Sequence, residues 1–300
     1  MVFVNRNDFY LAKTASLVKR FFAVFRNFIY RVGKQGKSMA AGYAVPDLPL
    51  FESRLFQADA ACCTVPFEEE IKQGYITIAG GHRVGMVGQV VTEDREKIRT
   101  MKYIRGINIR IAHEIKGVAT EILPFLYEGG KTRSVLLMSP PGGGKTTLLR
   151  DVVRNFSDGT IYGKGVTVGV VDERSEIAGC YMGQPQNDMG IRTDVLDACP
   201  KVSGMMLLLR AMSPKVIPID ELGSREELAA VSTVSNCGVK ILATMHAENL
   251  EDLYRREGVD TLLSQRRFEM ILILYKDNGH YSLKAMYEWD DKGGWKCCDY

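Results

Sequence analysis

A glycine-rich segment followed by a lysine and two threonines has the residue types that best suit phosphate binding. It runs Pro141-Gly142-Gly143-Gly144-Lys145-Thr146-Thr147. Consecutive glycines let backbone N–H groups approach an anion at the positive end of the helix that follows. We expect Lys145 to contact the β- and γ-phosphates of ATP and the Thr146 hydroxyl to bind Mg²⁺. The whole segment is therefore predicted to hold the nucleotide.

The residues around this loop decide between a phosphate site and a glycine-rich turn without a ligand. The usual pattern is G-x-x-x-x-G-K-[ST], and Ser139 stands in place of its first glycine. The apolar run from Val135 to Met138 precedes the loop, and a helical pattern over 146–156 follows it. A strand, a loop and a helix in this order favour the phosphate site.

A short apolar strand predicted at 216–219 ends in the acidic pair Asp220-Glu221. Side chains at the carboxyl end of a parallel strand lie in the crevice where ligands bind. We expect Asp220 to hold Mg²⁺ through water and Glu221 to polarise the attacking water. Such a pair is common in proteins that have no ATP site, so this interpretation depends on the phosphate loop.

Two further predicted strands end in polar residues. One places Thr244 and His246 at the same rim of the sheet, where a polar group can sense the γ-phosphate. The other is followed by Asp172-Glu173-Arg174-Ser175-Glu176, and we expect Glu173 to act in catalysis. The alternatives are a structural histidine and a solvated acidic loop.

The order of predicted elements indicates the fold class. Strands and helices alternate after residue 134, which predicts an α/β core of the RecA-like P-loop NTPase type. Before it, a short helix and three strands predict a smaller α+β N-terminal domain. We expect a basic amphipathic segment and linker at 1–45, the small α+β domain at 46–117 and the RecA-like ATPase domain at 118–300.

Positive charge is concentrated at the N-terminus. Residues 1–37 hold eight lysines and arginines against Asp8 alone, a net of +7, so the rest of the chain carries −4 of the total of +3. An apolar stripe from Leu17 to Val32 predicts an amphipathic helix within 10–32. This helix either contacts an anionic membrane or a partner, or packs on the next domain.

The composition excludes several classes of protein. A hydrophobic content of 46% with 25% charged residues is typical of globular chains, and no stretch approaches the roughly 20 apolar residues that span a bilayer. The seven cysteines have no C-x-x-C spacing, which favours a reduced cytosolic compartment without a zinc site.

The sequence Gly85-Met86-Val87-Gly88 has the G-x-x-G spacing of RNA-binding KH modules. Its apolar inner residues lie in a strand pattern, which argues against nucleic acid.

Five segments together form a specific combination of motifs. They are Glu69–Gly85, Ile107–Ala112, Ser139–Gly142, Val171–Ile177 and Thr244–Ala247. In this combination the chain resembles the stage III sporulation protein AA family from about residue 65 onward, and Ser139 is usual in that family. The family is similar to the hexameric ATPases of type II and type IV secretion.

This resemblance implies roles for individual residues. It implies an acidic box that includes Asp172, Glu173 and Glu176, and a histidine box of Thr244 with His246. It also implies that arginines of the N-terminal domain contact the nucleotide. Arg105 and Arg110 match by their order in the chain, and the alternative is that both lie on a solvated strand face.

We therefore predict a cytoplasmic ATPase that uses ATP and Mg²⁺. The resemblance implies a homo-oligomeric ring, a hexamer, that powers an envelope-spanning complex during sporulation at the mother-cell face of the membrane. Its expected partners are membrane-embedded channel or secretion-complex proteins, with peripheral contact to anionic membrane as a further expectation. The alternatives are a nucleotide-gated ring scaffold with incidental turnover and a nucleic-acid-associated P-loop ATPase.

Overall fold

The computed structural model describes residues 2–3, 68–93, 97–110, 112–141, 144–277, 280–290 and 294–298. The predicted basic helix within 10–32, its linker and the loop glycines 142 and 143 lie outside the described residues. The chain forms two units, of which the first ends at Ala112 and the second begins at His113. No helix in the described part of the chain is long and apolar enough to cross a membrane.

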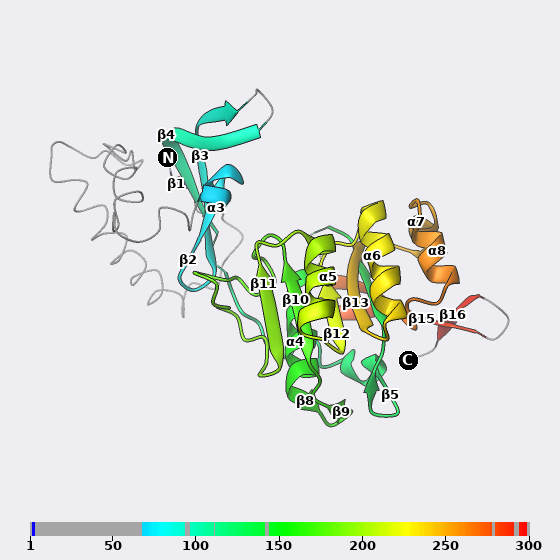
Figure 1. The fold of residues 1–300 in the computed structure, drawn as a ribbon. Coiled ribbons are helices and arrows are strands. Elements are labelled where there is room, and N and C mark those ends of the chain that lie inside the picture. The colour runs from blue at the N-terminus through cyan, green and yellow to red at the C-terminus, as the bar shows by residue number, and fades with distance from the viewer. Residues whose placement is uncertain are drawn as a thin grey trace. The chain divides into compact units, whose positions relative to one another are not determined.

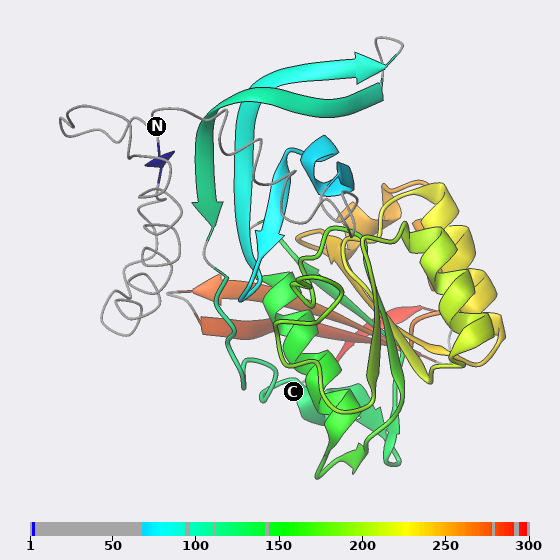
Figure 2. The same ribbon diagram turned by 60° about the vertical axis from the view of Figure 1, so that its left-hand side comes forward.

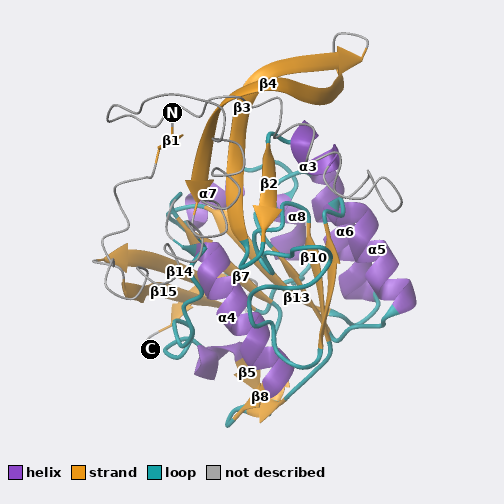
Figure 3. Cartoon of the chain, turned by 90° about the vertical axis from the view of Figure 1, so that its left-hand side faces the viewer, coloured by secondary structure: helices purple, strands orange, loops and turns teal. Residues whose placement is uncertain are grey.

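In the described residues of the first unit, helix α3 accompanies a small sheet (Figure 3). Its strand order is β1-β4-β3-β2, with β1 parallel to β4 and the other pairs antiparallel. The elements are β1 (Val2–Phe3), α3 (Glu68–Lys72), β2 (Tyr75–Ile78), β3 (His82–Glu93) and β4 (Lys97–Arg110). The buried side chains of Ile71, Ile76, Val84 and Met86 form its core. The alternating pattern predicts a third strand over 107–112, but β4 begins ten residues before Ile107 because it pairs with β3 as far as Glu93.

The second unit is built on an eight-stranded sheet of order β11-β10-β12-β13-β7-β14-β15-β16 (Figure 1). From β11 to β14, each strand in this order runs parallel to the next. The pair β14–β15 and the pair β15–β16 are antiparallel. The strands are β7 (Val135–Ser139), β10 (Val168–Asp172), β11 (Thr193–Asp197), β12 (Val216–Ile219), β13 (Lys240–His246), β14 (Met270–Asp277), β15 (His280–Trp289) and β16 (Trp295–Cys298). Strand β13 separates the phosphate-loop strand β7 from the acidic strand β12, which confirms the predicted RecA-like α/β fold.

Helices cover both faces of this sheet (Figure 2). They are α4 (Lys145–Asp158), α5 (Lys201–Ala211), α6 (Arg225–Asn236), α7 (Leu250–Tyr254) and α8 (Val259–Ser264). Strand residues alternate between faces, so Val135 and Leu137 of β7 pack in the apolar cluster with α4. Leu136 and Met138 pack in the opposite cluster with α5, α6 and α8. Burial on both faces explains why β7 is a continuous apolar run.

The short elements around strand β7 and helix α4 differ from the prediction. The apolar pattern over 118–126 predicts a helix, and this prediction is wrong: turns lead to a short 3-10 helix, η2 (Leu123–Leu126), that has Pro124 in its first turn. Two small hairpins were not predicted, namely β5 (Tyr127–Glu128) with β6 (Lys131–Thr132) and β8 (Gly159–Thr160) with β9 (Gly163–Lys164). The ring of Tyr127 packs edge-on against Phe156 of α4.

Candidate nucleotide-binding site

The predicted site residues of the second unit come from the same ends of neighbouring strands. Strands β7, β10, β12 and β13 are parallel, so residues that follow their carboxyl ends share one edge of the sheet. In this way Lys145, which begins α4 after β7, lies beside His246 at the end of β13, 101 residues later in the chain. The strand order, rather than any local motif, creates this edge.

The Lys145 side chain is buried and its ammonium group is surrounded by acceptors. Nζ donates to the backbone oxygens of Ser139 and Pro140 at 3.1 and 3.2 Å and lies 2.7 Å from Nδ1 of His246. Burial lowers the pKa of Lys145, while the carboxylates of Asp220 and Glu221 act in the opposite direction. An anion at this point would supply the charge compensation that a buried ammonium lacks.

The helix start next to Lys145 suits an approaching anion. Gly144 precedes α4 at φ 75°, in the left-handed region that glycine adopts without steric cost, and it has no side-chain cap. Pro141 is exposed, and Thr146 and Thr147 follow in the first turn of α4. Gly144 therefore does not cap the first N–H groups of α4 with a side chain. A helix start that binds phosphate needs these N–H groups for the anion.

Two hydroxyl groups hold the Asp220 carboxylate. Thr146 Oγ1 donates to Oδ2 at 2.6 Å and Thr244 Oγ1 donates to Oδ1 at 2.6 Å. The buried Thr244 hydroxyl also accepts from the backbone N–H of Glu221 at 2.8 Å. Hydroxyl and carboxylate oxygens are ligands that suit Mg²⁺, which is held by few protein groups together with phosphates and water. The described residues contain no cluster of three or more histidines, cysteines or acids that would hold a metal by itself.

Glu221 lies between His246 and Arg174. Its Oε1 is 3.0 Å from Nε2 of His246, and its Oε2 is 3.8 Å from the Arg174 guanidinium. Partial burial acts to raise the pKa of Glu221, but the hydrogen bond from His246 and the positive charges of Arg174 and Lys145 outweigh it and lower that pKa. Glu221 is thus ionised at neutral pH and able to accept a hydrogen bond from water.

His246 connects the phosphate loop with the acidic strand end. The Lys145 ammonium is only a donor, so Nδ1 accepts from it and Nε2–H donates to Glu221. Arg256 donates to the backbone oxygen of His246 and so holds the end of β13. The His246 imidazole is therefore in direct contact with Lys145 and with Glu221.

The carboxylate of Asp172 holds the acidic loop after β10. Asp172 is buried and accepts from the backbone N–H groups of Glu176 and Ala178 at 2.8 and 2.7 Å, and from Ile177 between them. Burial raises the pKa of Asp172, and these backbone hydrogen bonds oppose the rise. Of the predicted acidic box, Asp172 therefore shapes the loop.

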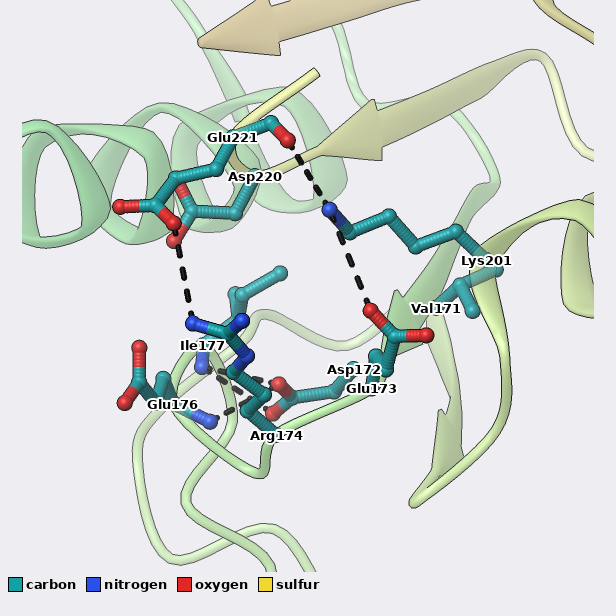
Figure 4. Close-up of a pocket in the computed structure, with 9 residues that line it drawn as sticks. All are labelled: Val171, Asp172, Glu173, Arg174, Glu176, Ile177, Lys201, Asp220 and Glu221. Carbon is teal, nitrogen blue, oxygen red and sulfur yellow. Dashed lines mark hydrogen bonds and ion pairs between the residues drawn. The ribbon is translucent and has the colours of Figure 1, made fainter. Parts of the chain in front are cut away.

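A cleft opens beside this loop, and Figure 4 shows its lining. It is lined by Val171, Asp172, Glu173, Arg174, Glu176, Ile177, Lys201, Asp220 and Glu221. Glu173 and Glu221, the two candidates for catalytic acids, both line it, and Lys201 lies between them, 4.0 Å from the Glu173 carboxylate. The cleft brings two acidic strand ends to one place.

Sequence reasoning missed two residues of this site. Arg150 of α4 donates to the backbone oxygens of Ile177 and Glu176 at 2.6 and 2.8 Å, so it fastens the acidic loop to the phosphate-loop helix. Lys201 contacts the end of β12 from the start of α5. Both carry the charge expected of solvated helix residues, so no sequence pattern distinguishes them from ordinary surface residues.

The remaining predicted residues lie in the first unit. Arg105 and Arg110 are both on β4, where Arg110 is exposed and pairs in register with Arg83 of β3. Their contact with the nucleotide stays a prediction.

Comparison with known proteins identifies the family. Residues 56–294 match the family described as Sporulation stage III, protein AA. Stage III sporulation protein AA of Bacillus subtilis (strain 168) is 43% identical over 223 residues, which are 74% of this chain and 72% of that protein. Protein SEEDLING PLASTID DEVELOPMENT 1 of Arabidopsis thaliana is 31% identical over 160 residues, 53% of this chain and 22% of that protein.

One solved structure that aligns with this chain is that of the ATPase DotB of Legionella pneumophila. It aligns with a TM-score of 0.49 and 15% sequence identity, over 70% of this chain and 59% of that chain. By the family match and the Bacillus relative, the chain belongs to the stage III sporulation protein AA family.

Proposed function

We propose that this protein binds ATP with Mg²⁺ and hydrolyses it. The observation that carries the proposal is the convergence of a buried lysine at a helix start, a hydroxyl–carboxylate pair and an ionised glutamate at one sheet edge. These are Lys145, Thr146 with Asp220, and Glu221. Each supplies a part that phosphoryl transfer to water needs.

The residues of the phosphate loop bind and neutralise the triphosphate. The backbone at the start of α4 donates to phosphate oxygens, and Lys145 exchanges its contacts with Ser139, Pro140 and His246 for phosphate. Thr146 and Asp220 would hold Mg²⁺, and the ion would supply positive charge to the phosphates. Thr244 keeps the Asp220 carboxylate in place from the neighbouring strand.

The acidic groups prepare the water for attack. Glu221, which is ionised, accepts a hydrogen bond from the attacking water and so orients it. Glu173 lines the same cleft and is the second candidate for this role. His246 contacts both Lys145 and Glu221, so loss of the γ-phosphate is transmitted to the end of β13.

We further propose that this ATPase works as a homo-oligomeric ring, a hexamer, that drives an envelope-spanning sporulation complex from the cytoplasm. The family's connection with stage III of sporulation supports the biological setting. Arg105 and Arg110 are the candidates for contact with nucleotide in such a ring. The partners are membrane-embedded proteins of that complex.

One observation favours a second candidate function, a nucleotide-gated scaffold. His246 joins Lys145 to Glu221, so phosphate that takes over the Lys145 hydrogen bonds changes the contacts at the ends of β12 and β13. Binding can therefore alter assembly even when turnover is slow. The two functions differ in whether hydrolysis is needed for assembly to cycle.

The test measures phosphate release and oligomer mass of the full chain, with and without Mg·ATP. We expect turnover that needs Mg²⁺ and rises with ring formation. Assembly on ATP with no phosphate release would replace the ATPase proposal by the scaffold. If the chain neither bound nucleotide nor assembled, both proposals would be overturned.

A further inference from the structure

We propose that Lys201 is a positioning residue that holds the backbone of Glu221 and links it to Glu173. This inference rests on the proposed ATPase function, since it assigns Lys201 a part in orienting the water-polarising acid. The ammonium group donates to the backbone oxygen of Glu221 at 2.9 Å (Figure 4). The same group lies 3.2 Å from the Glu227 carboxylate and 4.0 Å from that of Glu173.

The placement of Lys201 is unfavourable for the helix that carries it. Lys201 is the first residue of α5, after Pro200, where the positive end of the helix dipole repels a cation. Its side chain is only 16% exposed, so it is not a freely solvated surface lysine. The contacts with the Glu221 end of β12 compensate for this position.

Glu221 needs support because its backbone is strained. It has φ 55°, in the left-handed region that glutamate rarely adopts. Its N–H donates to Thr244 Oγ1 at 2.8 Å, and its oxygen accepts from Lys201. Side chains from two other elements therefore hold both backbone polar groups of this residue, which fixes the direction in which its carboxylate leaves the chain.

Glu227 holds Lys201 in this position. One of its oxygens, Oε2, accepts from the backbone N–H groups of Gly223 and Ser224 in a capping box at the start of α6. The other oxygen, Oε1, pairs with Lys201. The carboxylate that shapes the turn after Glu221 thus also orients the ammonium group that holds Glu221.

Lys201 also joins two strand ends. Glu173 follows β10 and Glu221 follows β12, and both carboxylates line the cleft. The Lys201 ammonium contacts the Glu173 carboxylate and the backbone oxygen of Glu221, and so ties the acidic loop to the Glu221 turn. Lys201 therefore affects catalysis through Glu221 without contact with the reacting atoms.

The experiment compares Lys201→Met with wild type in the full chain, with Lys215→Met as the matched control. Lys215 is an exposed lysine at the amino end of β12, the strand that Glu221 follows. We expect Lys201→Met to lower kcat about 10- to 100-fold, the cost of a misplaced catalytic group, with KM and nucleotide affinity within about twofold of wild type. Lys201→Arg should restore most of the turnover, and Lys215→Met should match wild type.

A double-mutant cycle separates positioning from general stability. In a Glu221→Gln background, Lys201→Met should lower kcat by less than about twofold further, because both changes act on one group. Multiplicative losses, unchanged kcat in Lys201→Met, or a raised KM with normal kcat would each overturn the inference.

A readout without turnover distinguishes this inference from the proposed function. If wild type releases no phosphate, the ATPase proposal fails, and the Tm values of Lys201→Met, Glu227→Gln and their double variant then decide on Lys201. If the two single Tm shifts sum to more than the shift of the double variant, Glu227 holds Lys201 at the Glu221 turn. Additive Tm shifts would overturn the inference.

Discussion

Nδ1 of His246 lies 2.7 Å from Nζ of Lys145. The residue proposed to bind phosphate and the residue proposed to sense it are therefore in direct contact. Because Nε2 of the same imidazole lies 3.0 Å from Glu221, phosphate that takes the Lys145 hydrogen bonds also changes the surroundings of the proposed water-polarising group. The predictions below test the groups on each side of this contact.

Replacement of Lys145 by alanine should abolish nucleotide binding. The backbone donors alone leave most of the triphosphate charge uncompensated, and charge-assisted hydrogen bonds are about twice as strong as neutral ones. Titration calorimetry with Mg·ATP checks this, with Lys164→Ala, an exposed lysine of β9, as the control. Circular dichroism should show an intact fold. Unchanged affinity in Lys145→Ala would place the nucleotide elsewhere.

The Glu221→Gln variant should bind ATP but hydrolyse it slowly. Lys145, Thr146 and Asp220 stay in place, while loss of a group that accepts a proton or orients water costs about 10²- to 10⁴-fold in rate. Phosphate release at saturating Mg·ATP measures the effect, and Glu226→Gln on exposed α6 surface is the control. Normal turnover would move the role to Glu173.

Arg150→Met should destabilise the second unit and slow turnover. It leaves the backbone oxygens of Ile177 and Glu176 without their donor, and a buried polar group without a partner costs about 1–3 kcal/mol. Denaturant unfolding measures the loss. Arg210→Met, at an exposed position near the end of α5, should be close to neutral. Equal stability of the two variants would contradict the proposed attachment of the acidic loop to α4.

Cys180 should resist thiol reagents that modify other cysteines. Burial and the nearby carboxylates of Asp197 and Asp172 raise the pKa of its thiol to about 12, so the reactive thiolate is absent at pH 8. The exposed Cys237 should react under the same conditions. Mass spectrometry after brief alkylation of the folded protein locates the label. Modification of Cys180 as fast as Cys237 would contradict the burial described for it.

The same thiol makes folding stability depend on alkaline pH. Its pKa is raised in the folded state, so the folded protein binds the proton more tightly and its contribution to stability is fully present below the unfolded value near 9. That contribution is lost as pH rises from about 9 towards 12. A Cys180→Ala variant should show a smaller loss of stability over this range, measured by denaturant unfolding.

The N-terminal segment should bring the full chain to anionic membranes. It lies outside the described residues, and the prediction depends on its net charge of +7 and its aromatic stripe. Each basic residue near an anionic surface contributes about 1 kcal/mol, an attraction that falls with salt. Liposome flotation of the full chain and of a chain that begins at Ser38 tests this. No binding by the full chain, or loss of folding in the shorter one, would instead favour packing of the helix on the next domain.

The local sequence was sufficient for elements whose pattern is strong. Short-range patterns predict helix α4 and the apolar strands β7, β10, β12 and β13. Strand β11 was missed because it is an edge strand whose residues are only partly buried, so its apolar pattern is weak. The length of β4 was missed because it is set by pairing with β3.

The sequence by itself determined which residue types stand at the carboxyl ends of the strands, since a buried strand followed by polar residues is a local pattern. Only the tertiary structure decided which of them meet. Strand order places β13 between β7 and β12, so His246 contacts both Lys145 and Glu221 and Thr244 holds Asp220. Arg150 and Lys201 bind backbone oxygens of distant turns, and such contacts have no sequence signal because any residue type presents the same oxygen.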